Sequence, residues 1–305
     1  MRIHTLDLNF RDTPNTIASY LVVGSDGPVL VETGPGSTIE TMKTRLAEHG
    51  FSPSDIRNVL VTHIHLDHAG AAGWWAQQGA QIFVHHVGAP HLINPAKLLA
   101  SAGRIYGELM DPLWGAMLPA PEDLVTPVFD GDTITVAGLS FTAIDTPGHA
   151  YHHHVFQLDN VAFTGDAAGI HIPGPSFVDL PAPPPEFNLE LWQQSVERLC
   201  ALDVDAIYPT HFGRVDDWRG HLETFSQLLD ASAEFVRIRM ERGLERVEII
   251  ENYRAWQRER VDSAQIDDTL VKRYEVSNPL YMSVDGIIRY WRKRLPVLQP
   301  GNSGE

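Results

Sequence analysis

The chain has 305 residues, of which 43% are hydrophobic and 20% charged, a composition typical of a globular protein with a buried core. Asp and Glu outnumber Lys and Arg by 39 to 23, and the net charge of -16 argues against nucleic acid or an anionic membrane as a partner. The single cysteine excludes an intramolecular disulfide, and the opening sequence MRIHTLDLNF has no export signal. We therefore expect a cytoplasmic protein.

The first part of the chain predicts strands that lead into a histidine-rich loop. The apolar runs IASYLVV and PVLVETG flank the turn residues GSDG and are typical of a β-hairpin. Ser37 and Glu40 have the spacing of a capping box, which predicts a helix that ends near Gly50. The run NVLVT at 58–62 predicts a short buried strand, and HIHLDHAG follows it directly.

The remainder predicts further strands and then helices alone. Residues 87–127 mix Pro, Met, Trp and Tyr with helical stretches, which we interpret as a helical insertion. Residues 173–185 contain six prolines and predict a loop. The other expected elements before residue 216 are strands at 81–86, 132–146, 155–159, 161–166 and 204–211 and a helix at about 189–202 with Asn188 as its cap.

Apolar residues recur at helical spacing from Asp217 to about Arg294, and the last ten residues predict a frayed tail. The order of elements predicts a β-rich domain over 1–215 and a helical extension over 216–305. An apolar face of the extension would cover the core or pair with a second subunit, and we expect a homodimer.

Seven side chains of metal-ligand type lie at the ends of predicted strands. His63, His65, Asp67 and His68 fall within six residues, and alternate residues of an extended loop point to the same side. The later ones are His149 in TPGH, Asp166 in TGD and His211 in PTHFG. Imidazole and carboxylate are ligands that Zn²⁺ and Fe²⁺ accept. The sequence therefore predicts a metal centre.

With this ordered set of motifs, the sequence resembles the metallo-β-lactamase fold superfamily over roughly residues 1–215. The resemblance implies an α/β (α+β) fold, an αββα sandwich of two mixed β-sheets flanked by helices, with a two-metal site at one edge. It also implies that Asp166 bridges both ions, and it divides the other ligands into His63, His65 and His149 for the first metal and Asp67, His68 and His211 for the second. The family's Asp-Thr-Gly appears here as Glu32-Thr33-Gly34, a departure that we expect to affect ligand orientation.

The function that the resemblance implies is a metal-dependent hydrolase with two Zn²⁺ per chain, or with Fe or Mn in their place. A metal-bridging hydroxide would attack the acyl carbon of an ester, lactone or thioester in a small-molecule substrate. Asp67 and Asp166 are the candidates for handling the proton. The alternative is an oxidoreductase of the persulfide-dioxygenase type with one iron, and a non-catalytic scaffold is a third hypothesis.

Residues around the motifs do not identify the substrate. Glyoxalase II-type thioesterases resemble this chain in the metal motif and the helical extension, but no Lys/Arg cluster stands at the site loops. Lactonases of this fold carry a Tyr where this chain has Gly169. We expect His153 to lie near the site and its neighbours His152 and His154 to face away from it. Four residues of the insertion either line an apolar pocket or pack within the insertion: Tyr106, Met110, Trp114 and Met117.

Overall fold

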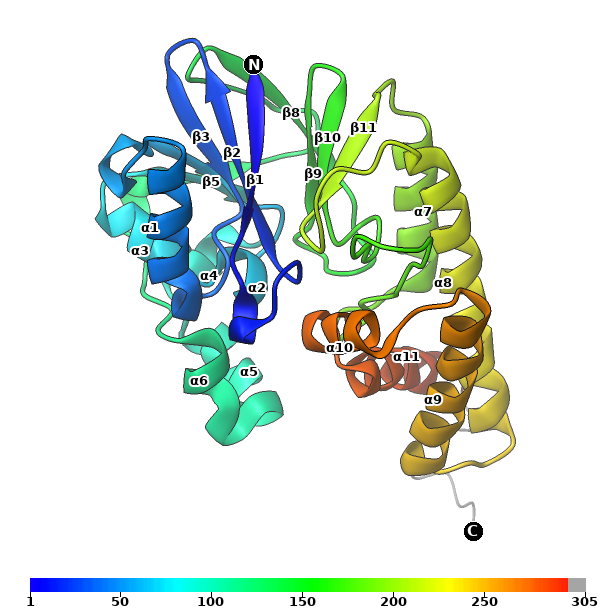
Figure 1. Cartoon of the computed structure of the whole chain (residues 1–305). Coiled ribbons are helices and arrows are strands. Elements are labelled where there is room, and N and C mark those ends of the chain that lie inside the picture. The colour runs from blue at the N-terminus through cyan, green and yellow to red at the C-terminus, as the bar shows by residue number, and fades with distance from the viewer. Residues whose placement is uncertain (296–305) are drawn as a thin grey trace.

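The computed structural model describes residues 1–295, so the tail predicted over the last ten residues lies outside the described part. Two β-sheets face each other at the centre, with helices on their outer sides (Figure 1). This confirms the predicted αββα sandwich with helices after it. None of the described helices is both long and apolar enough to cross a membrane. The homodimer and the cytoplasmic location stay predictions.

The first sheet is mixed, because its first three strands are antiparallel and the others continue in parallel. In spatial order it contains β1 (Arg2–Asp7), β2 (Ala18–Gly24), β3 (Gly27–Val31), β4 (Asn58–Leu60), β5 (Gln81–His85) and β6 (Val125–Val128). The predicted hairpin is β2–β3, with Leu21 opposite Leu30 and Tyr20 opposite Val31. Both faces of this sheet are buried, which explains the nearly continuous apolar runs.

The second sheet has a parallel pair at one edge, β10 with β11, and is otherwise antiparallel. Its strands, in spatial order, are β11 (Ala206–Pro209), β10 (Val161–Gly165), β9 (His154–Leu158), β8 (Leu139–Asp145) and β7 (Thr133–Val136). Phe163 from this sheet packs against Tyr20 of the first sheet, and Phe141 and Phe156 belong to the same buried cluster. These rings form part of the core between the sheets. The loops that leave the strands at one edge of this core carry the ligand-type residues.

The helices of the first half lie on the outer side of the first sheet and beyond its end (Figure 1). They are α1 (Ile39–Glu48), α2 (Leu66–Ala69), α3 (Ala72–Gln77), α4 (Ala89–Ile93), α5 (Ala96–Tyr106) and α6 (Met110–Trp114). The last three lie within residues 87–127, where helical stretches are predicted. The predicted capping box is wrong, because Ser37 lies in a 3₁₀ turn and its hydroxyl donates to the carbonyl of Leu113 at 2.6 Å. A tertiary partner thus replaces the local one.

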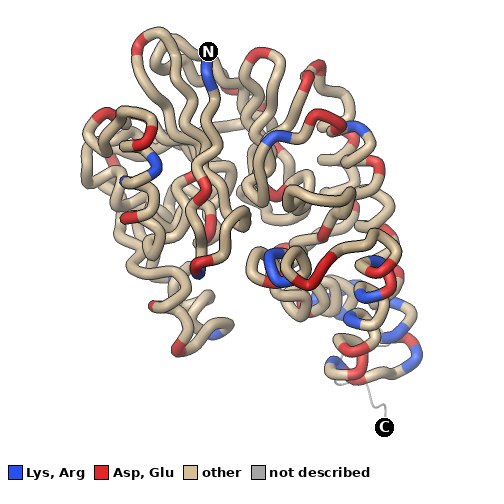
Figure 2. The backbone as a smooth tube through the Cα atoms, viewed as in Figure 1, with Lys and Arg blue, Asp and Glu red and all other residues tan. Residues whose placement is uncertain are grey.

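Five helices cover the second sheet and extend beyond it. They are α7 (Leu189–Cys200), α8 (Trp218–Glu241), α9 (Arg246–Ser263), α10 (Asp268–Ser277) and α11 (Leu280–Arg294). Asn188 caps α7 as predicted, with its side chain accepting from the Leu191 N–H. The later helices share a core with α7 and with the proline-rich segment before it, through contacts such as Trp192 with Phe225. Lys and Arg gather on these helices, whereas the sandwich carries mostly Asp and Glu (Figure 2).

His221 joins α8 to the loop that follows β10, and it predicts a pH-dependent stability. Its Nε2–H donates to the Ala168 carbonyl at 2.7 Å, and burial lowers the pKa of His221 to about 4. Between pH 6.5 and 4, His221 is therefore mostly protonated in the unfolded chain and mostly neutral in the folded chain. The free energy of unfolding consequently falls as the pH falls. His221→Gln keeps a donor without this ionisation. Urea unfolding with a chelator present should show that the free energy of unfolding decreases from pH 7 to pH 5 by ~2 kcal/mol more in wild type than in the His221→Gln variant. Equal losses would contradict the prediction.

Candidate metal centre

The seven predicted ligands come together at one edge of the sandwich. His63 and His65 lie on the loop after β4, and His65 directly precedes α2, which carries Asp67 and His68. The three later ligands leave the second sheet after β8, β10 and β11. Their side chains are buried or nearly so, and 20% of the Asp67 side chain is exposed. The sandwich therefore positions residues from distant parts of the sequence around one centre.

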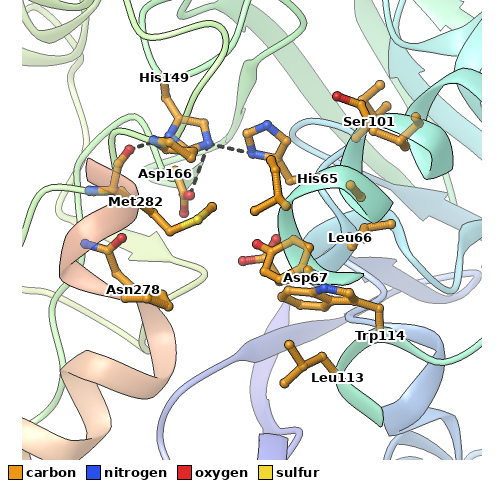
Figure 3. Close-up of a pocket in the computed structure, with 18 of the residues that line it drawn as sticks. His65, Leu66, Asp67, Ser101, Leu113, Trp114, His149, Asp166, Asn278 and Met282 are labelled. Carbon is orange, nitrogen blue, oxygen red and sulfur yellow. Dashed lines mark hydrogen bonds and ion pairs between the residues drawn. The ribbon is translucent and has the colours of Figure 1, made fainter. Parts of the chain in front are cut away.

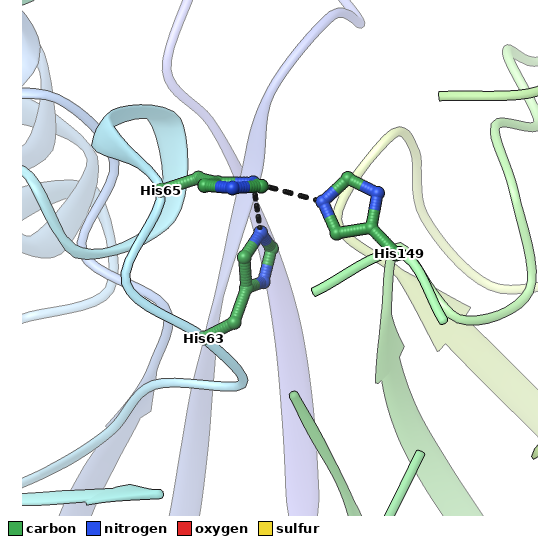
Figure 4. A group of neighbouring side chains, drawn as sticks. All are labelled: His63, His65 and His149. Atoms are coloured by element: carbon green, nitrogen blue, oxygen red, sulfur yellow. Dashed lines mark hydrogen bonds between the residues drawn. The ribbon is translucent and has the colours of Figure 1, made fainter. Parts of the chain in front are cut away.

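Three histidine rings form what we call the first cluster: His63, His65 and His149. The Nδ1 atom of His65 lies 2.9 Å from His63 Nε2 and 2.8 Å from His149 Nε2 (Figure 4). The inward nitrogens of His63 and His149 have no proton to share, because each ring donates its Nδ1–H outward. His63 donates to the Thr62 hydroxyl at 3.1 Å and His149 to the Pro181 carbonyl at 2.7 Å. Converging lone pairs of this kind suit a cation.

The second cluster consists of Asp67, His68 and His211. Asp67 Oδ2 lies 3.7 Å from His68 Nε2 and 3.4 Å from His211 Nε2. The Nδ1–H groups of these two rings also point outward, to Glu32 Oε1 at 3.2 Å and to the Thr16 carbonyl at 2.6 Å. Asp67 Oδ2 and the two inward nitrogens thus face one another, and each ring is oriented by an outward acceptor as in the first cluster.

Asp166 lies between the two clusters. Its Oδ2 is 3.3 Å from His149 Nε2, and its Oδ1 is 3.4 Å from His68 Nε2 and 3.6 Å from His211 Nε2. Among the described residues, Asp166 Oδ1 and His68 Nε2 are buried without a hydrogen-bond partner. Burying such atoms unpaired costs free energy that coordination of a cation would recover. The donor set therefore fits two metal ions that share the Asp166 carboxylate.

Backbone geometry brings Asp166 to this place. Gly165 has a φ of 52°, and a Cβ there would lie 2.4 Å from the Thr62 hydroxyl and 2.7 Å from His153 Nε2. His153 is buried next to the centre, as predicted: its Nε2 accepts the Asp166 N–H at 3.1 Å, and its Nδ1 lies 2.8 Å from the Thr146 hydroxyl. A glycine at 165 is what allows this close packing.

Glu32 replaces the family's Asp and serves three partners. Its Oε1 accepts from the Thr62 hydroxyl at 2.5 Å, from the Thr210 hydroxyl at 3.1 Å and from His68 Nδ1. Glu32 has a φ of 66°, which a non-glycine residue rarely adopts. The longer side chain therefore reaches and orients His68, and through Thr62 it also supports His63.

Charges within the centre oppose the effect of burial. Although burial alone would raise it, the pKa of Asp166 is held well below its ordinary value by His68, His149 and His211. Burial, with His149 and His152 nearby, lowers the pKa of His65 to about 3. Deprotonated carboxylates beside an unprotonated His65 are the forms in which these groups bind metals.

A cavity of about 280 Å³ opens beside the two clusters. Figure 3 shows His65 and Asp67 between Ser101 of α5 and Leu113 and Trp114 of α6 on one side and the C-terminal helices on the other. The Trp114 ring stacks on Phe10 at 5.4 Å and meets Tyr106 edge-on at 5.2 Å. Of the four residues of the insertion, Tyr106 and Trp114 line the cavity. Met110 and Met117 pack in the core behind it.

Some cavity residues could not be found from the motifs. Asn278 and Met282 reach the cavity from the junction of α10 and α11, so the helical extension forms part of its wall (Figure 3). Arg11 and Lys97 also line it, although they are far apart in sequence. No local pattern marks these residues, because only the packing of distant elements brings them together.

The predicted orientation of His152 is wrong, and that of His154 is right. The backbone turns before β9 begins at residue 154, so strand alternation does not apply to His152, which lines the cavity beside His65. His154 faces away and lies 2.5 Å from Asp145, which also lies 3.4 Å from His85. His85 Nδ1 accepts the Val87 N–H, so its Nε2 carries a proton. His85, Asp145 and His154 thus form a hydrogen-bonded link between β5 of the first sheet and the β8–β9 pair of the second.

Comparison with known proteins agrees with this geometry. The family model described as the metallo-beta-lactamase superfamily matches residues 12–211, more than half of the chain. The metallo-beta-lactamase fold-containing protein ST1585 of Sulfurisphaera tokodaii is 26% identical over 70% of this chain and 79% of its own length. An atrochrysone carboxyl ACP thioesterase of Aspergillus fumigatus is 30% identical over 63% of this chain. The match covers only 50% of that relative's own length.

Solved structures share the fold. The metallo-beta-lactamase family protein TTHA1429 of Thermus thermophilus superposes with a TM-score of 0.66 at 22% identity, covering 95% of this chain and 93% of that one. The subclass B3 metallo-beta-lactamase BJP-1 of Bradyrhizobium japonicum has a TM-score of 0.50 at 21% identity, covering 70% of this chain and 86% of its own. Because the family model matches residues 12–211 and the sandwich fold is shared, the chain belongs to the metallo-beta-lactamase superfamily.

Proposed function

We propose that this protein is a dinuclear zinc hydrolase that cleaves an ester, lactone or thioester of a small acyl molecule. The observation that carries the proposal is the position of Asp166, which turns one carboxylate oxygen toward each cluster. The first cluster would hold one ion and the second cluster the other, with Asp166 shared between them. Iron or manganese would also suit imidazole and carboxylate donors.

Bound zinc would supply Lewis acidity toward an acyl carbonyl oxygen and would acidify water enough to provide a nucleophile near neutral pH. The chain's own part is to hold the ligands rigidly and to manage the proton. Asp67 faces His68 and His211 through Oδ2, while its Oδ1 has no hydrogen-bond partner among the described residues. Because Asp67 lines the cavity, Oδ1 is placed to take a proton from water and pass it to the leaving group.

The cavity favours an apolar or aromatic acyl group. Trp114, Phe10 and Tyr106 offer ring faces and edges, and Met282 and Leu113 add apolar surface. The relative named as an ACP thioesterase supports a thioester within the proposed range. We therefore rank thioesters with aromatic or branched acyl groups first among the candidates.

The one-iron alternative receives less support from the side chains. Two histidines and one aspartate would be enough for that chemistry, which leaves the second cluster without a purpose. His68 Nε2, in the second cluster, is buried and has no hydrogen-bond partner among the described residues, which favours a second ion there.

Metal analysis followed by a hydrolysis screen tests the proposal. Purified protein should contain about two zinc ions per chain and should hydrolyse at least one class among thioesters, lactones and aryl esters, with activity lost on chelation and restored by zinc. A single iron with oxygen consumption on glutathione persulfide would support the oxidoreductase instead. A protein that binds no metal and cleaves none of these substrates would overturn the proposal.

A further inference from the structure

The proline-rich segment before α7 contacts the first cluster from outside. At one end, the Pro181 carbonyl accepts the Nδ1–H of His149 at 2.7 Å. At the other end, Glu186 Oε2 lies 3.2 Å from His152 Nε2 and accepts the Tyr151 N–H at 3.3 Å. A segment outside the ligand motifs thus contacts one ring of the first cluster directly and also the two residues, Tyr151 and His152, that follow His149 closely in the chain.

His152 and Glu186 form a pair with a defined donor and acceptor. His152 Nδ1 accepts the Ile64 N–H at 3.4 Å, so the ring proton is on Nε2 and donates to Glu186. His152 is buried, with 5% of its surface exposed. Because Ile64 separates His63 from His65, the pair also holds the backbone of the ligand loop. A ring whose two nitrogens are used in this way is a support and not a metal ligand.

The pair stands against the outer side of His65. The two imidazole rings meet edge-on, with centroids 5.6 Å apart and planes at 89°. His65 turns Nδ1 toward the other rings of the first cluster, so its Nε2–H is the donor left for an outside acceptor. Ligand-type atoms of His65, His152 and Glu186 lie within 4.8 Å of one another, and Glu186 Oε1 has no hydrogen-bond partner among the described residues.

We propose that His152 and Glu186 are positioning residues that hold His65 and thereby set the affinity of the first metal position. This inference rests on the proposed function, because it needs a metal at the first cluster. Carboxylates that orient metal-bound histidines typically change metal affinity 10–100-fold when they are removed. Neither residue belongs to the seven ligands of the motif.

The C-terminal helices hold the segment in place. The Ser283 hydroxyl accepts the Ala182 N–H at 3.1 Å and donates to the Leu180 carbonyl at 2.6 Å. At Gly286 of α11, a Cβ would lie 1.9 Å from the Ala182 carbonyl oxygen, so only glycine allows the helix to approach this closely. The helical extension therefore holds the part of the segment that lies four to six residues before Glu186.

The test is a comparison of metal affinities between Glu186→Gln and a matched control, Asp145→Asn. Asp145 makes the same type of pair with a buried histidine, His154, on the side facing away from the centre. Competition with a chromophoric chelator should show ~10–100-fold weaker binding of one zinc ion in E186Q and wild-type affinity in D145N. His152→Ala should weaken binding similarly, and His152→Gln, which keeps a donor at the Nε2 position, should restore part of the affinity. The absorption spectrum of the cobalt-substituted protein should change in E186Q and should stay as in wild type in D145N.

Different results separate this inference from the proposed function. If wild type binds two ions and hydrolyses a substrate while E186Q binds both ions as tightly, the positioning role is wrong and the proposed function stands. Equal weakening in E186Q and D145N would also overturn it, since it would reflect general loosening. Metal-free unfolding temperatures of all variants identify any that fold poorly. A wild type without metal affinity overturns both.

Discussion

Replacing Asp166 with Asn is expected to lower kcat/KM by about 10³-fold or more, or ~4 kcal/mol of transition-state stabilisation. Asn keeps the size of the side chain but removes its charge and turns an NH₂ group toward one cluster. Three inward nitrogens that face the carboxylate, on His68, His149 and His211, would lose their shared anion. Both metal positions should weaken together, because one oxygen of Asp166 faces each of them.

The measurement is kcat/KM on the best substrate of the screen, together with metal content per chain. Asp159→Asn is the matched control, because Asp159 is exposed in the turn between β9 and β10 with a φ of 49° that Asn also tolerates. D159N should keep wild-type activity and both ions. If D166N retained activity within a few-fold of wild type, Asp166 would not be shared by two catalytic ions.

Replacing Glu32 with Ala is expected to destabilise the fold by ~3–5 kcal/mol and to reduce metal affinity at the second cluster. The buried carboxylate is the acceptor for Thr62, Thr210 and His68, so its loss leaves three buried donors without a partner. Although burial opposes it, the charges of Asp166, Asp67 and Glu32 raise the pKa of His68. The variant should therefore also bring the pKa of His68 back down.

Urea unfolding with a chelator present measures the stability loss without the contribution of metal binding, and chelator competition measures the affinity. Glu32→Asp, which matches the family pattern, keeps the charge and should cost clearly less than E32A. An E32A protein as stable as wild type would show that the three donors find other acceptors. The role assigned to Glu32 would then be wrong.

The strands, the helices and the order of the ligand-type motifs could be predicted from the sequence, and the family resemblance that these motifs carry implied the αββα sandwich and the grouping of the seven candidate ligands. Strand patterns such as IASYLVV come from burial on both faces, and HIHLDHAG places four ligand-type residues within six positions. These features depend on neighbours in sequence. The ligands then meet because strand ends at one edge of a sandwich are close in space.

The support around the ligands was decided by the tertiary structure. His152 turned toward the centre against the expected alternation, because the chain is not yet a strand there, and its acceptor is 34 residues away at Glu186. Asn278 and Met282 entered the cavity from the helical extension, and Ser37 left its expected cap for the Leu113 carbonyl. Local periodicity determines elements and motif spacing, whereas hydrogen-bond partners across elements depend on how those elements pack. The sequence by itself therefore determined the fold class and the set of candidate ligands, and only the packed chain determined what orients each of these side chains and what encloses the cavity.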